Sequence, residues 1–256
     1  MKRFSVLLTL CFFLMAGSAM ATPINPIGGM GSESSLQVVL NNITTAPVLG
    51  TSSVKASGPV NDALSDGLDS NWNITATGGS FATLIIEIAG WSGVNTFGVF
   101  DAANPSKTVL LFAGVAGAGD QATLSIKSDG SVYVNLADSG VDFSGNTFGY
   151  YLKNDPGQIF YSATGLNADQ FDHMVAFQGT NTDTVKLAAN LPAGLWTNNE
   201  YVLAWEDTSG GGDWDYQDLV LMVESVRPVP EPATMLLLGS GLLGFATFGR
   251  RKFLKK

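Results

Sequence analysis

The sequence predicts an all-β protein, built as a β-sandwich or jelly-roll-like domain over residues 35–228. Short runs of β-branched and aromatic residues recur along the chain, and turn signals separate them. The chain contains 30 glycines, and its content of helix formers is low. No period of about 20 to 50 residues repeats, so neither a solenoid nor a propeller is indicated.

The strand-like segments are short and closely spaced, as in sandwiches and jelly rolls. Turns such as Ser128-Asp129-Gly130 and Asp155-Pro156-Gly157 separate some of them. Residues 44–80, rich in Ser, Thr, Gly and Asn, predict a long loop or a short helix near residues 62–69. The predicted strands are 35–43, 81–90, 96–101, 108–114, 122–128, 131–137, 147–153, 158–163, 173–179, 200–206 and 218–226.

The first 21 residues have the three parts of a secretory signal peptide. A basic start precedes an apolar run, and Ala19-Met20-Ala21 forms a cleavage site after Ala21. Cys11, the single cysteine, lies inside this signal, so the mature chain has no thiol for catalysis, disulfides or cysteine-based zinc sites. Residues 22–34, rich in Pro and Gly, predict a flexible entry segment.

The C-terminal part predicts a transmembrane helix over residues 233–249, which are apolar and uncharged. At about 1.5 Å per residue the helix reaches roughly 25 Å, and a hydrocarbon core of about 30 Å would thin locally to fit it. Basic residues follow and favour a cytoplasmic end, so the body of the protein faces outward. They are Arg250, Arg251, Lys252, Lys255 and Lys256.

Residues 229–256 combine Pro230-Glu231-Pro232, the apolar helix and the basic end. This order resembles the PEP-CTERM sorting signal of Gram-negative bacteria. The resemblance implies that an exosortase, a membrane processing enzyme, recognises Pro230, Glu231 and Pro232. The protein would then be anchored in the inner membrane before processing and pass to the cell envelope, the outer surface or an exopolysaccharide matrix. A plain C-terminal anchor is the alternative.

The body of the chain is strongly acidic. Residues 22–230 hold six basic and 21 acidic residues, a formal net charge of −15, whereas the whole chain carries −9. Such a body repels phosphate backbones, so nucleic acid is excluded as the expected partner.

One acidic stretch, EDTSGGGDWDYQDLV at residues 206–220, lies between two predicted strands and so predicts a hairpin tip. Gly210, Gly211 and Gly212 allow the chain to fold tightly there. Asp213, Asp215 and Gln217 alternate, as the first oxygen ligands of many calcium loops do, and calcium takes six to eight oxygens. The sequence therefore predicts a Ca²⁺ site formed by Glu206, Asp207, Asp213, Asp215, Gln217 and Asp218.

Three alternatives to a calcium site are possible for this stretch. An EF-hand starting at Asp213 would place Glu224 correctly at position 12 but Asp218 at position 6, where glycine is required. A solvated turn, with Asp side chains capping backbone amides, is the second. The third is a polysaccharide-active hydrolase, which needs two carboxylates across a cleft about 5 to 10 Å wide, whereas a metal site needs convergent oxygens.

Two segments carry a further resemblance: YVLAWEDTSGGGDWDYQDLVLMV (201–223) and FYSATGLNADQFDHMVAFQG (160–179). Both resemble the DUF4114 family, and the similar part covers about 155–226. The family occurs in secreted and surface proteins, often calcium-associated, without an established enzymatic activity. By position, the resemblance implies an acidic signature at Glu206, Asp207, Asp213, Asp215 and Asp218, with Asp172 and His173 upstream; Gln217 departs from the more usual Asn.

His173 is the sole histidine. In an extended strand Asp172 and His173 point to opposite faces, so we expect a structural histidine and no His-Asp catalytic pair. Trp214 and Tyr216 alternate with the acids and should lie exposed on the other face of the tip, where they could stack on sugar rings.

Together these features predict an exported, non-enzymatic envelope protein. Its β-domain binds calcium and has a structural or adhesive role, with extracellular polysaccharide as a partner.

Overall fold

The computed structural model describes residues 34–56, 68–77, 79–87 and 93–229. The predicted signal peptide with its cleavage site at Ala21, the sorting residues Pro230, Glu231 and Pro232, and the transmembrane helix 233–249 lie outside these ranges. So does most of the possible helix near 62–69. Within the described ranges, no helix combines the length and the apolar character needed to cross a bilayer.

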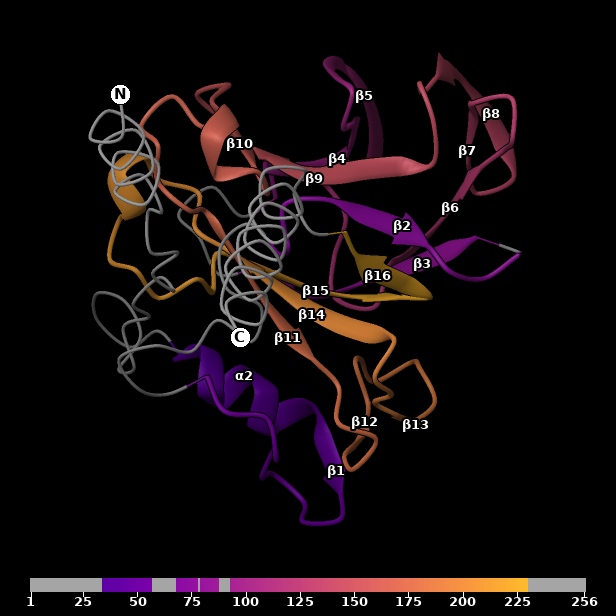
Figure 1. Cartoon of the computed structure of the whole chain (residues 1–256). Coiled ribbons are helices and arrows are strands. Elements are labelled where there is room, and N and C mark those ends of the chain that lie inside the picture. The colour runs from indigo at the N-terminus through magenta and orange to yellow at the C-terminus, as the bar shows by residue number, and fades with distance from the viewer. Residues whose placement is uncertain (1–33, 57–67, 78, 88–92, 230–256) are drawn as a thin grey trace, which may run out of the picture.

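The described chain is mostly β-structure in three antiparallel sheets (Figure 1). Two larger sheets pack face to face, and a small sheet joins β1 (Thr44–Ala46), β12 (Thr184–Val185) and β13 (Gly194–Leu195). The six-stranded sheet has the order β16 (Val226–Pro228), β2 (Trp72–Ile74), β9 (Thr147–Lys153), β4 (Thr96–Asp101) and β5 (Asn104–Phe112), with β10 (Ile159–Tyr161) also paired to β9. The seven-stranded sheet has the order β11 (Met174–Gln178), β14 (Glu200–Trp205), β15 (Leu219–Glu224), β3 (Ser80–Glu87), β6 (Gln121–Ile126), β7 (Ser131–Val134) and β8 (Ala137–Asp142).

Side chains from both large sheets form one core between them. Phe97 and Tyr150 of the six-stranded sheet stack at 5.6 Å, and Phe97 meets Trp205 of the seven-stranded sheet edge to face at 5.8 Å. Trp72 lies against Tyr201 at 4.9 Å in the same way. These aromatic contacts tie the sheets together as in a sandwich, so the all-β prediction is confirmed.

The prediction of a strand over 35–43 is wrong, because residues Leu36–Ile43 form the helix α2. Its buried residues recur at helical spacing: Leu36, Val39, Leu40 and Ile43. They belong to a second core on the outer face of β11, β14 and β15, below which α2 lies in Figure 1. An apolar run of this length fits a buried strand or one face of a helix equally well, and the tertiary contact decides.

The helix explains why β14 and β15 are apolar at nearly every position. Leu203 and Leu221 point into the core between the sheets, while Val202 and Val220 point into the core under α2. The strands are therefore buried on both faces. Only the ends of this hairpin are free to carry polar residues.

Most other predicted strands are present, with β4 and β9 at the predicted bounds. Residues 44–80 are not entirely loop, because β1, β2 and the start of β3 lie there. The prediction also missed β8, β12 and β13, which are short or largely exposed and so lack an apolar pattern. Two short 3-10 helices, η1 (Thr164–Leu166) and η2 (Ser209–Gly211), complete the described elements.

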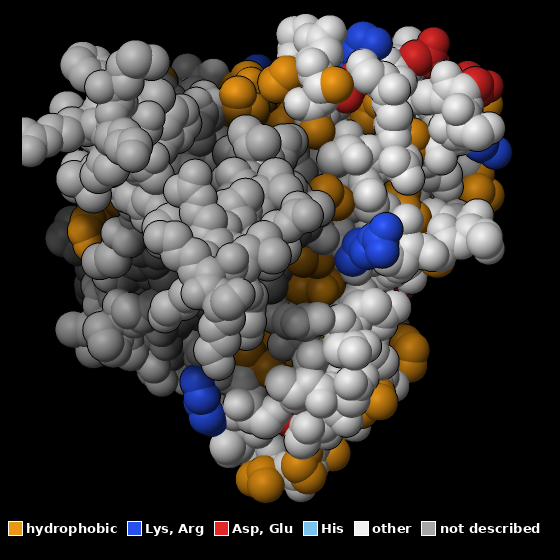
Figure 2. Space-filling view, viewed as in Figure 1, with side chains coloured by type: hydrophobic (Ala, Val, Ile, Leu, Met, Phe, Trp, Pro, Cys, Tyr) orange, Lys and Arg blue, Asp and Glu red, His pale blue; other side chains and the backbone are white. Residues whose placement is uncertain are grey.

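On the face shown in Figure 2, the described Lys and Arg side chains are scattered singly among uncharged and acidic ones.

The packing of α2 yields a stability prediction. Leu40 is fully buried, so Leu40→Ala should lower the free energy of unfolding by about 2–5 kcal/mol, since it removes apolar contact and leaves a cavity. Val38 lies on the same helix but is 41% exposed, and Val38→Ala should change stability by less than about 0.5 kcal/mol. Urea denaturation of both variants measures the difference. Equal effects would contradict the docking of α2 on the sheet.

Candidate metal centre

The acidic stretch connects two neighbouring strands, as the sequence predicts. Trp205 at the end of β14 pairs with Leu219 at the start of β15, and residues 206–218 join them. The connection is not a solvated turn, however. Glu206 and Asp207 are 2% exposed, and Asp215 and Gln217 are 1% exposed, whereas Asp213 and Asp218 are half-buried.

The three glycines make this burial possible. Gly212 has φ 47° and ψ −118°, and a Cβ there would lie 2.2 Å from Oε1 of Glu206. A Cβ on Gly211, which has φ 82°, would lie 2.2 Å from the ring of Phe171. Only glycine allows the backbone to approach Glu206 and Phe171 so closely.

The carboxylates of the loop converge in two sets that share Glu206. In the first set, oxygens of Glu206, Asp213 and Asp215 lie within 4.8 Å of one another. In the second set, oxygens of Glu206, Asp207 and Asp218 do so. Every acidic residue predicted for the calcium site therefore belongs to one of these sets.

Several buried oxygens of this region accept no hydrogen bond. They are Oε2 of Glu206, Oε1 of Gln217 and Oδ1 of Asn95. Gln217 lies beside Asp215, because its backbone and side-chain amides donate to that carboxylate. Buried acceptors without a donor are costly, and a cation is one partner that satisfies them.

Two asparagines that the sequence analysis missed support Asp207. The side-chain amide of Asn95 donates to Oδ2 of Asp207 at 2.8 Å, and that of Asn154 donates to the Asp207 carbonyl at 3.0 Å. Both lie far from the loop in the sequence, immediately before β4 and immediately after β9. No local pattern distinguishes them from ordinary turn residues.

Burial and mutual repulsion hold protons on the loop in the absence of a metal. Burial, followed by the charge of Asp218, raises the pKa of Glu206 to about 10. Burial and the charge of Asp207 raise the pKa of Asp218 to about 7. Burial also raises the pKa of Asp207, against hydrogen bonds that favour its charged form. In the described chain, no Lys or Arg forms an ion pair with these groups.

His173 is buried and holds the loop in place without joining the acids. Its Nδ1 lies 2.9 Å from the Glu206 carbonyl, and its Nε2 lies 3.0 Å from Oδ2 of Asp169. Both neighbours are oxygen atoms, so the two ring nitrogens are engaged and neither is free to reach the loop carboxylates. The ring also stacks on Phe160 at 4.0 Å, and these contacts support the structural role expected for His173.

Asp169, which the sequence analysis missed, also accepts from the backbone N–H of Gly210 at 2.8 Å. Burial alone would raise the pKa of Asp169. The pKa is nevertheless lowered, because the carboxylate accepts hydrogen bonds from the backbone of Gly210 and Phe171 and contacts His173. Asp172, the upstream residue of the family pattern, has Oδ1 near the backbone N–H of Met174, at 3.3 Å. Asp172 and His173 thus have separate roles.

The expectation of two exposed aromatics on the loop is wrong for Tyr216. Its ring is buried, and its hydroxyl donates to the Asp172 carbonyl at 2.6 Å. Trp214 is 39% exposed. Both residues have positive φ, 65° and 55°, so the loop does not alternate between two faces as an extended strand would.

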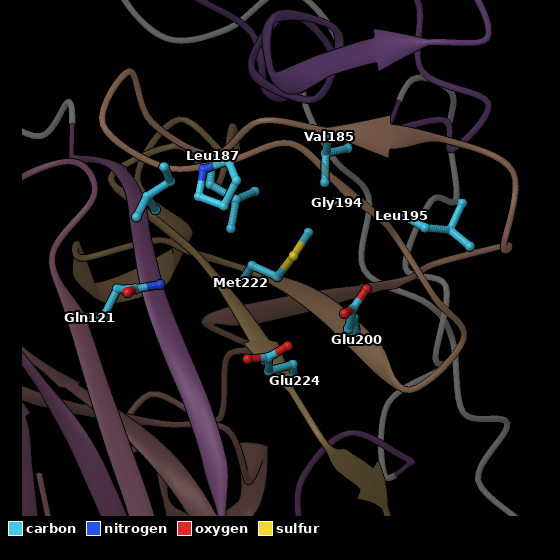
Figure 3. Close-up of a pocket in the computed structure, with 10 residues that line it drawn as sticks. Gln121, Val185, Leu187, Gly194, Leu195, Glu200, Met222 and Glu224 are labelled. Carbon is cyan, nitrogen blue, oxygen red and sulfur yellow. The ribbon is translucent and has the colours of Figure 1, made fainter.

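A second acidic pair lies in a cavity of about 280 Å³ at the other end of the hairpin (Figure 3). Glu200 and Glu224 are directly opposite in β14 and β15 and share a hydrogen bond. Burial, followed by the charge of Glu200, raises the pKa of Glu224. Met222, Val185 and Leu187 are among the apolar residues of the wall. The two carboxyls are in direct contact, which leaves no space for a substrate between them.

These features define a β-domain protein with a buried acidic loop. Residues 117–226 match the family model described as a domain of unknown function, DUF4114, and residues 228–252 match the PEP-CTERM protein-sorting motif. Residues 117–226 are thus similar to DUF4114 domains. The PEP-CTERM motif indicates an exported protein that an exosortase recognises and sorts to the cell envelope. Neither the curated proteins nor the solved structures include a match.

The DUF4114 match starts at 117, upstream of residue 155 where the sequence analysis placed it. It contains the whole acidic loop, but β3 lies outside it and pairs with both β15 and β6. The folded unit is therefore larger than the matched segment.

The raised pKa values predict a pH dependence for the metal-free protein. A carboxyl whose pKa is higher in the folded than in the unfolded state stabilises the fold at low pH, and this contribution is lost as pH rises. With EDTA present, the free energy of unfolding should fall between pH 5 and 8 by on the order of 3 kcal/mol. Urea denaturation across this range measures it. A flat profile would mean that these carboxyls ionise normally.

The pair in the cavity predicts a stabilising substitution. Glu224→Gln removes the repulsion from Glu200 and keeps a hydrogen-bond donor, so it should raise the free energy of unfolding at pH 7 by about 0.5–1 kcal/mol. The gain should disappear near pH 4, where Glu224 is protonated in both states. Asp142→Asn, on an exposed position of β8, is the control for charge removal. A loss of stability in Glu224→Gln would contradict the view that Glu200 and Glu224 repel each other in the folded protein.

Proposed function

We propose that this protein is a calcium-binding β-domain with a structural or adhesive role in the cell envelope. One observation carries the proposal: buried carboxylate and amide oxygens converge at the end of the β14–β15 hairpin and lack hydrogen-bond donors. Oε2 of Glu206 and Oε1 of Gln217 are the main examples. Side chains 1 to 2% exposed do not obtain these donors from bulk solvent.

The donor set favours calcium over other cations. All candidate ligands are oxygens, which hard cations prefer, and His173 is committed to Asp169 and Glu206. Calcium accepts six to eight ligands in irregular geometry. A loop with three consecutive glycines of positive φ can place its oxygen ligands in such a geometry. Magnesium requires a tighter octahedron and retains its waters.

The arrangement supports binding over catalysis. Glycoside hydrolases keep their two carboxyls about 5 to 9.5 Å apart to admit a sugar and a water. The loop oxygens lie within 4.8 Å of one another in each set, and four of the six predicted ligand residues are buried. A non-enzymatic role is therefore proposed for the loop.

In the envelope, a bound cation would fix the loop and the strand ends beside it. Trp214, 39% exposed, is the aromatic of this loop that a sugar ring can reach. Extracellular polysaccharide is accordingly the partner we propose for the adhesive role.

Calcium should raise the melting temperature of the wild-type protein. The gain follows RT ln(1 + [Ca²⁺]/Kd), about 2.7 kcal/mol at a hundredfold excess over Kd. Magnesium at the same concentration should do less. Asp213→Asn with Asp215→Asn should reduce the calcium response and raise the melting temperature in EDTA, because repulsion is relieved.

Differential scanning calorimetry in EDTA, calcium and magnesium measures these effects, with Asp142→Asn as the control that keeps the wild-type response. If isothermal titration calorimetry detects no calcium binding by the wild-type protein at millimolar concentration, the proposed function is wrong.

A further inference from the structure

We infer that the acidic loop binds two calcium ions, with Glu206 as the residue that bridges them. The inference rests on the proposed calcium function and assigns its stoichiometry. It follows from the arrangement of the two carboxylate sets, from the unpaired amide oxygens beside each set and from the charge of the loop.

The geometry of the sets comes first. Calcium–oxygen distances of about 2.3–2.6 Å place two ligands of one ion at most about 5 Å apart. The oxygens within each set satisfy this limit, since they lie within 4.8 Å of one another. The loop oxygens form two such sets, and Glu206 is the residue common to both.

Each set has its own unpaired amide oxygen. Gln217 donates its side-chain amide to Asp215 of the first set, which leaves its Oε1 without a partner. Asn95 donates its side-chain amide to Asp207 of the second set, which leaves its Oδ1 without a partner. Both residues are at least 96% buried. The same arrangement thus occurs twice: a side-chain amide donates a hydrogen bond to a carboxylate of the set, and its oxygen accepts none.

One oxygen of the bridging residue is itself unsatisfied. Oε2 of Glu206 accepts no hydrogen bond, although the side chain is 2% exposed. A Cβ added at Gly212 would lie 2.2 Å from Oε1 of Glu206. The Gly212 backbone therefore packs directly against this carboxylate and fixes its position. A fixed carboxylate with a free oxygen between two sets is suited to ligate one ion on each side.

Charge supports the same count. The two sets contain five different carboxylates, so one calcium would offset two of five negative charges and two calcium ions would offset four. The Nε2 atom of His173 contacts Asp169, which is in neither set.

The experiment counts ions on the full chain in detergent, by calcium titration calorimetry and native mass spectrometry. We expect two ions on the wild type, one on Asp213→Asn, which damages the first set, and one on Asp218→Asn, which damages the second. Asp142→Asn should still bind two. Circular dichroism checks that each variant folds. If Asp218→Asn fails to fold, Asn95→Ala is the milder variant of the second set. It should lower the affinity for one of the two calcium ions at least tenfold.

Terbium and europium test whether the two ions are neighbours. Ions bridged by one carboxylate lie about 4 Å apart, so a mixed terbium and europium sample should show a shorter terbium lifetime than terbium alone. Wild-type binding of one ion overturns the inference and leaves the proposed function standing. Binding of no ion overturns both. Binding of two ions without energy transfer places the second ion elsewhere and also overturns the inference.

Discussion

The antiparallel pairing of β14 with β15 is the constraint on which the acidic loop depends. Both strands are buried on their two faces, between the sheet core on one side and α2 on the other. The ends of the loop at Trp205 and Leu219 are therefore fixed to each other and to the interior. This rigidity allows the chain to keep like charges close together that a mobile loop would separate.

The loop is held by few contacts, and each has a distinct physical basis. Gly212 lacks a Cβ and so leaves space for the Glu206 carboxylate. Asp169 accepts a hydrogen bond from the backbone N–H of Gly210, and the Tyr216 hydroxyl donates to the Asp172 carbonyl. His173 links Asp169 to the start of the loop, because its other ring nitrogen contacts the Glu206 carbonyl. The carboxylates are thus preorganised by backbone and side-chain contacts and by the contact of His173 with Asp169.

Sequence reasoning located the acidic loop and most of the strands because both have strong local signals. β4 and β9 are short runs of aromatic and β-branched residues buried at nearly every position, and the glycines mark the turn. It failed for α2, where an apolar run suits two structures, and for Tyr216, where positive φ breaks the alternation. Asn95 and Asp169 could not be found because their role arises from contacts across the fold. The family match likewise omits β3, although that strand completes the sheet.

The last strand has a mechanical consequence for a protein sorted through its tail. β16 ends at Pro228 and pairs with β2 at the edge of the six-stranded sheet, and the sorting motif begins at that same residue. A force applied through the tail is therefore transmitted first to β16, without a spacer. An edge strand loaded from its end yields by losing its hydrogen bonds to one neighbour, so the β16–β2 pair would be the first point of rupture under tension.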